Sequence, residues 1–230
     1  DSLFVHNSGS GITLLGGVAD VRDSLFVSNE GIGLDVAQDT ALTVERVLFA
    51  DNTGAAVELV YAPPATFAHA VFRDNGAAAI VATNNVDQVD VRDSVFDGNG
   101  GTVEADPGLC DLERIVLWDN VTDQTACDID TVLAVEPMFG STFSSDPLEW
   151  DLHLDPASPL IDAGSVADPD PDGTPADIGL YGGPDAGSRD LDWDGYPEWW
   201  QPGDYDFVNY PGAGWDCDDR DASVYPGSGC

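Results

Sequence analysis

The stretch SLFVSNEG at residues 24–31 decides the fold, because close variants of it recur every 21–24 residues along the chain. An aromatic residue stands at the same place in each variant, and in most of them an Asn follows it after three residues. A period of this length is typical of solenoid folds, in which each repeat forms one coil and stacks on the next. The aromatic positions are Phe4, Phe26, Phe49, Phe72, Phe96, Trp118 and Phe139.

The recurrent Asn predicts the same tight turn in every coil. Asn tolerates the left-handed region of backbone space and can hydrogen-bond its own backbone, and Gly usually comes next in these repeats. If the coils stack in register, the side-chain amides form a ladder along the axis of the solenoid. The ladder positions are Asn7, Asn29, Asn52, Asn75 and Asn99, and Asn120 follows Trp118 after two residues instead of three.

Short apolar runs lie between these turns, for instance at residues 12–14, 42–44 and 89–91. Three such runs in each repeat, without a helical period, favour a parallel β-helix. A leucine-rich repeat has a similar length, but its Leu-x-x-Leu-x-Leu pattern is absent. We therefore predict an all-β solenoid of about six coils over residues 1–139, with the aromatic residues stacked as a core column and adjacent coils ~4.8 Å apart.

A second column of basic residues precedes the aromatic one. An Arg or His stands three or four residues before the ring in most repeats, and each Arg has an acidic neighbour. Like charges stacked ~4.8 Å apart repel, so we expect alternation with carboxylates in a solvated ion-pair ladder. A basic strip that binds a substrate is the alternative. The positions are Arg22, Arg46, His69, Arg92 and Arg114.

The charge balance restricts the partners of the chain. There are 43 acidic residues against 7 basic ones, which gives a formal net charge of −36. Nucleic acids and anionic lipids are repelled by such a protein. Repulsion among the carboxylates also opposes folding, so bound Ca²⁺ or a salty medium is expected to neutralise them. No run of 18 apolar residues exists, and we expect no membrane insertion.

The four cysteines indicate an oxidising compartment. They lie in two pairs, Cys110 with Cys127 and Cys217 with Cys230, without a CxxC motif or a His at zinc spacing. This usage favours two disulfides in a secreted, extracellular or cell-surface protein. Cys110 and Cys127 fall in the last two coils, where a disulfide would link neighbouring rungs, and two buried free thiols are the alternative.

Four motifs follow the last regular coil. They are EPMF at 136–139, WDLHL at 150–154, SPLIDAG at 158–164 and ADIGLYGG at 176–183. In this order they resemble the closing segment of bacterial right-handed β-helix repeat proteins. The resemblance implies a right-handed parallel β-helix, with residues 140–183 covering the open edge of the last coil. The N-terminal edge has no comparable cap, so we expect further coils or another copy of the chain to stack there.

An acidic loop at residues 190–196, DLDWDGY, has the ligand spacing of a calcium site. Its alternate carboxylates can turn to one side while the Gly permits a sharp bend, and Ca²⁺ takes six to eight oxygen ligands. The twelfth position is Gln201 instead of Glu, and prolines interrupt the flanks, so we predict a calcium loop without an EF-hand. The predicted ligands are Asp190, Asp192, Asp194, the backbone carbonyl of Tyr196, and Glu198.

Further acidic motifs accompany this loop. DCDDRD at 216–221, a Pro-Gly and a closing Cys complete a pattern that resembles the acidic metal-binding repeat in surface proteins of myxobacteria and their relatives. The resemblance implies a metal-binding tail at residues 184–230, with Cys217 joined to Cys230. It also implies that Asp216, Asp218, Asp219 and Asp221 share divalent ions with the first loop. A weaker candidate, or a plain acidic loop, is Asp168, Asp170 and Asp172.

These motifs favour a structural or adhesive surface module stabilised by calcium. The alternatives are a noncatalytic carbohydrate-binding module and, less favoured, a polysaccharide lyase or glycoside hydrolase. Lyase chemistry uses a Lys or Arg base beside acidic ligands, and a hydrolase uses two carboxyl groups across the scissile bond. The chain contains no Lys, and the loops predicted between its strands are short.

Removing calcium is expected to unfold residues 185–230 and to affect the coils much less, because only the tail depends on bound ions for its core. The measurement is thermal unfolding with and without a chelator, combined with metal analysis of the purified chain. Identical unfolding curves in the two conditions would contradict the calcium assignment.

Overall fold

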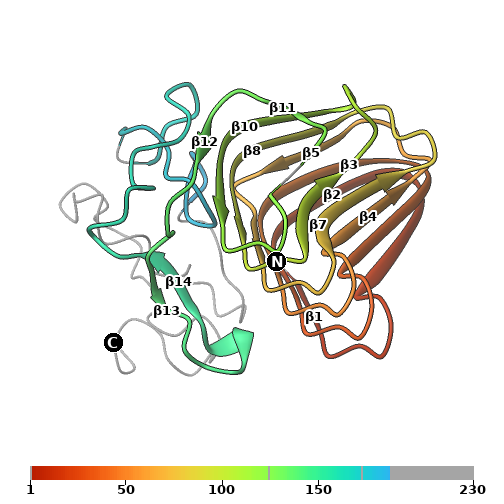
Figure 1. The fold of residues 1–230 in the computed structure, drawn as a ribbon, viewed down its shortest axis with the longest axis horizontal. Coiled ribbons are helices and arrows are strands. Elements are labelled where there is room, and N and C mark those ends of the chain that lie inside the picture. Colours follow the sequence, from red (N-terminus) through yellow and green to blue (C-terminus); the bar gives the residue numbers. More distant parts are fainter. Residues whose placement is uncertain (1, 124, 172, 187–230) are drawn as a thin grey trace.

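The computed structural model describes residues 2–123, 125–171 and 173–186 (Figure 1). Almost all of the regular structure in these residues is β-strand, apart from one short 3₁₀ helix, η1, at Pro147–Glu149. The strands are β1 (Ser2–Val5), β2 (Ile12–Val27), β3 (Leu34–Ala50), β4 (Val57–Val60), β5 (Ala65–Ala68), β6 (Val71–Arg73), β7 (Ala78–Thr83), β8 (Val89–Asp97), β9 (Gly101–Glu104), β10 (Cys110–Trp118), β11 (Asp128–Ile129), β12 (Val132–Leu133), β13 (Phe139–Ser141) and β14 (Asp151–Leu154).

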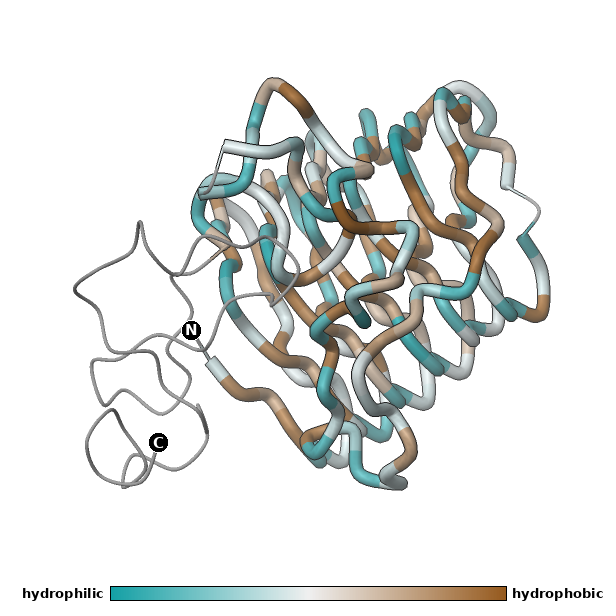
Figure 2. Tube along the Cα trace, turned by 90° about the vertical axis from the view of Figure 1, so that its left-hand side faces the viewer, coloured by the Kyte–Doolittle hydropathy of each residue, from teal (hydrophilic) through white to brown (hydrophobic). Residues whose placement is uncertain are grey.

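Strands β1–β12 form the stacked coils of a parallel β-helix, as predicted. Every pairing between coils is parallel and joins equivalent positions of successive repeats, for example Phe4 with Phe26 and Phe26 with Phe49. Strands β13 and β14 instead form an antiparallel pair after the last coil, so the predicted boundary at residues 139/140 falls inside β13. Figure 2 shows hydrophilic and hydrophobic residues alternating along the coils, as expected where one side of each strand faces a core.

The aromatic column fills the inside of the coils. The rings of Phe4, Phe26, Phe49, Phe72 and Phe96 stack in sequence, with centroids 4.6–5.3 Å apart. All but Phe4 are completely buried. The separation of the rings follows the spacing of the coils, so the column extends by one ring with each repeat.

The prediction that Trp118 continues this column is wrong. Leu117 pairs with Phe96, and Trp118 pairs with Asp97. Because side chains alternate across a strand, this shift of one residue turns Trp118 outward, where 39% of its surface is exposed, while Leu117 is 8% exposed. Phe139 also lies outside the column, in β13.

The asparagine ladder runs without interruption from Asn7 to Asn120. Asn52 shows the pattern: its side-chain oxygen accepts hydrogen bonds from the backbone and side-chain N–H groups of Asn29, at 3.2 and 2.8 Å. Its own Nδ2 donates to Asn75 Oδ1 at 2.9 Å and to the carbonyl of Phe26 at 3.0 Å. Each buried amide in the ladder is satisfied by its neighbours, which ties every coil to the next.

The closing segment packs along the flank of the coils, not over the open edge of the last coil as predicted. Figure 1 shows residues 139–171 and 173–186 beside the stack. Apolar side chains on the outer face of successive coils form a second core with this segment. The coils contribute Leu25, Val27, Leu48, Ala50, Val71, Val95 and Val116, and the segment contributes Trp150, Leu152, Leu154, Leu160, Ile178, Leu180 and Tyr181.

A disulfide joins Cys110 and Cys127, as the sequence predicted. Cys110 is the first residue of β10, and Cys127 precedes β11. The bond therefore links the last two coils, where the strands of the final coil are only two residues long. Cys217 and Cys230 lie outside the described residues.

Truncating Leu117 is expected to destabilise the protein more than truncating Trp118. Leu117→Ala removes buried atoms from the core column and should cost about 2–3 kcal/mol. Trp118→Ala acts at an exposed position and should cost less than about 1 kcal/mol. Denaturant unfolding of the two variants and the wild type gives the free energies that check which substitution costs more. The reverse order would place Trp118 in the column.

Breaking the ladder in its middle is expected to cost about 2–4 kcal/mol, since Asn52→Ala leaves the buried N–H groups of Asn29 without their acceptor. Asn7→Ala is the matched control, because Asn7 stands at the exposed end of the same ladder. It should cost less than about 1 kcal/mol. Equal losses in the two variants would show that the ladder is not a source of stability.

Candidate functional site

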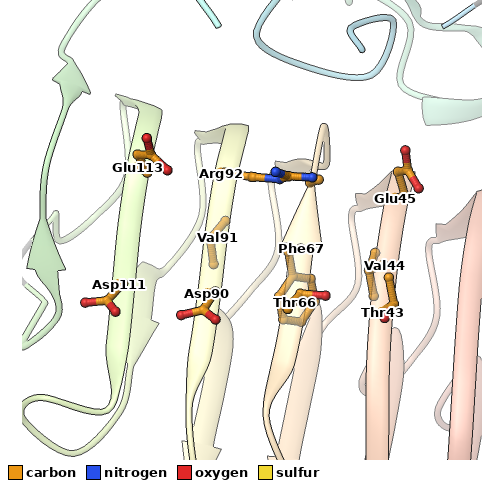
Figure 3. A pocket seen from close by; sticks show the side chains of 11 residues that line it. Thr43, Val44, Glu45, Thr66, Phe67, Asp90, Val91, Arg92, Asp111 and Glu113 are labelled. Atoms are coloured by element: carbon orange, nitrogen blue, oxygen red, sulfur yellow. The ribbon is translucent and has the colours of Figure 1, made fainter. Parts of the chain in front are cut away.

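A groove of about 540 Å³ lies on the outer face of β3, β5, β8 and β10 (Figure 3). Its middle is hollow because Thr66 and Ala68 are small, while charged side chains stand on the coils to either side. Phe67 belongs to the same strand but points inward and is buried. The exposed side chains of the groove therefore carry hydroxyl, carboxylate and guanidinium groups, while the buried Val44, Phe67 and Val91 line it from the side of the core.

Register produces the two rows of side chains in this groove. One row runs from Thr43 through Thr66, Asp90 and Asp111 to Asp128, one residue per coil. The other row runs two positions further along each strand and carries Glu45, Ala68, Arg92 and Glu113. Because both rows repeat with the coils, successive groups lie ~4.8 Å apart along the solenoid.

The carboxylates in the groove differ in their partners. Asp90 and Asp111 share one amide, since Gln88 Nε2 donates to both at 3.0 Å. Neither forms an ion pair with a basic side chain in the described part of the chain. Glu45, in contrast, pairs with Arg22 at 3.2 Å and with Arg46 at 2.8 Å. The negative charge of Asp90 and Asp111 is therefore not neutralised within the coils.

Arg92 bounds the groove on the side of the closing segment. Its Nη1 lies 3.2 Å from Asp168 Oδ2, so the guanidinium bridges β8 to the closing segment. Figure 3 shows the Arg92 side chain reaching across toward β5, above Phe67. This arginine is therefore partly occupied by a carboxylate of the protein itself.

The prediction of a single arginine column is wrong in register. Arg22 and Arg92 belong to the row of Glu45, whereas Arg46 and Arg114 lie one residue further along their strands. The predicted alternation is present in this second row, because Arg46 makes two contacts with Asp23, at 2.7 and 3.1 Å. Arg114 pairs with Asp93 in the same way.

This ion-pair row is buried, not solvated as predicted. Arg46 is 2% exposed and Asp93 is completely buried, because the closing segment covers them. His69 lies between these two residues, with Gly182 and Gly183 packed against its ring. Burial lowers the pKa of His69 to about 4, although the Asp93 charge opposes this shift. His69 is therefore neutral at neutral pH and fills space in the interface.

In the candidate metal loop at residues 168–172, the carboxylates of Asp168 and Asp170 contact other groups of the protein. Asp170 is buried, and its two oxygens accept hydrogen bonds from the backbone N–H groups of Asp177, at 2.8 Å, and Gly183, at 2.5 Å. Asp168 turns to Arg92, and Asp172 lies outside the described residues. Within the described ranges, no three His, Cys, Asp or Glu side chains are grouped as metal ligands.

The two stronger calcium clusters, at residues 190–198 and 216–221, lie outside the described residues, so calcium binding there stays a prediction. The fit of a calcium ion can be considered only at Asp168 and Asp170. Their carboxylate oxygens already accept hydrogen bonds from the Arg92 guanidinium and from backbone N–H groups. These two residues therefore serve the docking of the closing segment in this structure.

Sequence reasoning missed the contact that holds the β13–β14 hairpin. The Arg73 guanidinium lies 5.0 Å from the centre of the Trp150 ring and 5.8 Å from that of Phe139. It also contacts Asp97, the next coil's residue in the same row. Burial raises the pKa of Asp97 to about 6, with Asp74 and Asp119 adding to the shift and Arg73 opposing it.

Comparison with known proteins supports the same fold. The sequence model of the family described as "Right handed beta helix region" matches residues 1–108. No curated protein and no solved structure gave a match. Together with the parallel stack of coils, the family match shows the predicted right-handed parallel β-helix. In the described part of the chain, the helical structure is too short and too polar for a membrane span.

The buried Asp97 is expected to make stability depend on pH. Its pKa in the folded protein, about 6, lies above the ordinary value of 3.8, so the folded chain binds the proton more tightly than the unfolded chain. The free energy of unfolding should therefore fall by about 2 kcal/mol as the pH rises from about 4 to about 6.

Replacing this residue should remove that part of the pH dependence. Denaturant unfolding of Asp97→Asn across the same pH range is the measurement, and Asp87→Asn, at an exposed loop position, is the control. If the free energies of unfolding of wild type and Asp97→Asn differ by the same amount at every pH in this range, the shift in the pKa of Asp97 is refuted.

Proposed function

We propose that the chain is a noncatalytic structural module of a secreted or cell-surface protein. Its stiff β-helix holds an outer face for adhesion, and its acidic tail is stabilised by bound calcium. The observation that carries this proposal is the continuous asparagine ladder, in which every coil from Asn7 to Asn120 is tied to the next. Such a rod keeps the groups on its surface at fixed spacing.

Several features of the described coils support a rigid rod. The stacked rings fill the inside, the closing segment adds a second core along one flank, and a disulfide links the last two coils. A disulfide of this kind also supports an oxidising environment, such as the cell exterior. The net charge of −36 supports calcium as the counter-ion of the acidic tail.

The arrangement of the groove supports binding over catalysis. A glycosidase places its two carboxyl groups on either side of the scissile bond. Asp90 and Asp111 share the Gln88 amide and stand in one row on a single sheet face, so both would approach a ligand from the same side. This placement suits contact with a ligand better than cleavage of one.

Incubation with neutral, acidic and amino polysaccharides, with and without calcium, tests the noncatalytic assignment. We expect no new reducing ends and no unsaturated products in any mixture. The proposal fails if the wild-type chain releases product and Asp90→Asn does not. Asp35→Asn, which removes a carboxylate from another face of the coils, controls for the change in net charge.

A further inference from the structure

The closing segment lies over a column of polar side chains that repeats with the coils. Its members are Asp23, Arg46, His69, Asp93 and Arg114, one from each of five successive coils. All five have a backbone φ between 49° and 52°, so each coil makes the same bend at this position. The column is therefore one feature of the interface between the coils and the closing segment.

The charges in this column alternate at both ends but not at its middle. Asp23 pairs with Arg46, and Asp93 pairs with Arg114. His69 stands between the two pairs and is 3% exposed. A neutral imidazole leaves both ion pairs undisturbed, whereas an imidazolium would place a second buried positive charge next to that of Arg46.

Two glycines of the closing segment form a cover over the His69 ring. A Cβ atom at Gly182 would lie 2.8 Å from Nδ1, and one at Gly183 would lie 2.8 Å from Nε2. Both ring nitrogens therefore face the main chain of the closing segment, with no room for a side chain between them. An imidazolium can reach water only if this glycine cover moves away.

The other charged groups near His69 come from the coils and from the closing segment. Burial of the ring has the largest influence and lowers its pKa to about 4, because it disfavours the charged form. Asp93 and the backbone carbonyl of Asp177 oppose this shift, and Arg92 and Arg46 add to it. The carboxylates of the closing segment have these contacts: Asp168 with Arg92, Asp170 with the N–H groups of Asp177 and Gly183, Asp177 with the N–H group of Asp162, and Asp185 with Arg46 at 4.0 Å.

We propose that His69 is an acid-sensitive latch for the closing segment. At neutral pH the uncharged ring is buried under the glycine cover, and the segment is docked. In mild acid the ring takes up a proton, and residues 158–171 and 173–186 separate from the flank of the coils. Separation exposes apolar side chains of the flank, such as Leu48 and Val71. This latch is independent of the adhesive role and of the calcium in the proposed function.

The direction of the pH dependence follows from the two states of the ring. An exposed imidazole has a pKa of about 6.5, and in the docked state the pKa of His69 is about 4. The docked state binds the proton more weakly, so docking is fully stable above the exposed value and weakens as the pH falls toward 4. The ratio of docked to separated molecules should be about 20-fold lower at pH 5 than at pH 7.

Asp97 cannot produce this loss, because its titration acts in the opposite sense. Burial raises its pKa to about 6, so the folded form gains stability as the pH falls through this value. Exposed carboxylates have ordinary pKa values of about 4 and stay mostly charged at pH 5. The interval between pH 7 and pH 5 therefore isolates the histidines as the source of a loss.

Hydrogen exchange of the whole chain, followed by mass spectrometry at pH 7 and pH 5, tests the latch. Calcium is held constant, and the rates are corrected for the intrinsic effect of pH on exchange. The test variant is His69→Gln, whose side chain cannot take up a proton. The matched control is His6→Gln, which replaces an exposed histidine. His153 is present in all three proteins, so its titration cannot cause a difference between them.

We expect corrected exchange in residues 158–171 and 173–186 to be about 20-fold faster at pH 5 than at pH 7 in the wild type and in His6→Gln. In His69→Gln the corrected rates should be the same at both pH values. The amides of the coils should stay protected in all three proteins. Equal protection of the segment at both pH values in the wild type overturns the latch, as does an equal loss in His69→Gln.

An NMR titration of the wild-type histidine rings decides the case in which His69→Gln fails to dock at either pH. We expect the His69 ring to titrate well below pH 6.5, together with changes at the amides of Gly182 and Gly183. Exposed His6 is the internal reference. A His69 ring that titrates with His6, or that titrates without any change at the two glycines, overturns the proposal.

Discussion

The strands of each coil in this protein form their ladder of main-chain hydrogen bonds with the coil before it and the coil after it. Parallel pairing in register therefore repeats every side-chain position along the axis, and each position becomes a column of like residues. A column is stable only if its members tolerate a neighbour ~4.8 Å away. Phenylalanine rings do so by stacking, asparagine amides by hydrogen bonding, and buried charged side chains by alternating in sign.

The charged columns show how this constraint is met in different surroundings. Where the closing segment covers the coils, Asp23 and Arg46 alternate and neutralise each other. Burial makes an unpaired charge costly there, so the residue between Arg46 and Asp93 is a neutral His69. On the uncovered face, water screens the carboxylates, and Asp90 and Asp111 form no ion pair with a basic side chain among the described residues. Burial by the closing segment thus separates structural charges from charges available for binding.

The closing segment has a second consequence for the molecule. By packing on the outer face of the coils, it gives a thin solenoid a second core without lengthening it. Arg73 holds the β13–β14 hairpin against this face through the rings of Phe139 and Trp150. Asp168, Asp170 and Asp185 face the coils or the segment's own backbone, so part of the acidity of the chain serves docking.

The sequence by itself determined the period, the parallel β-helix, the phenylalanine and asparagine columns and the pairing of Cys110 with Cys127. It did so because stacking in register repeats the same residue types at the same spacing. The sequence also contained the signal that corrects the placement of Trp118. In the other repeats the ladder Asn follows the column residue after three positions, and counting three positions back from Asn120 gives Leu117. A shift of one residue between aromatic side chains is invisible to composition, but it reverses the face of the strand.

Only the tertiary structure decided where the closing segment lies, which charges are buried and which form a groove. These facts depend on contacts between residues far apart in the chain, such as Arg73 with Trp150 and Arg92 with Asp168. The continuous apolar runs at residues 25–27 and 47–50 are typical of strands covered on both faces, but no local pattern specifies which segment covers them. The surface that the closing segment covers is built from apolar side chains of successive coils, so it exists only once the coils have stacked.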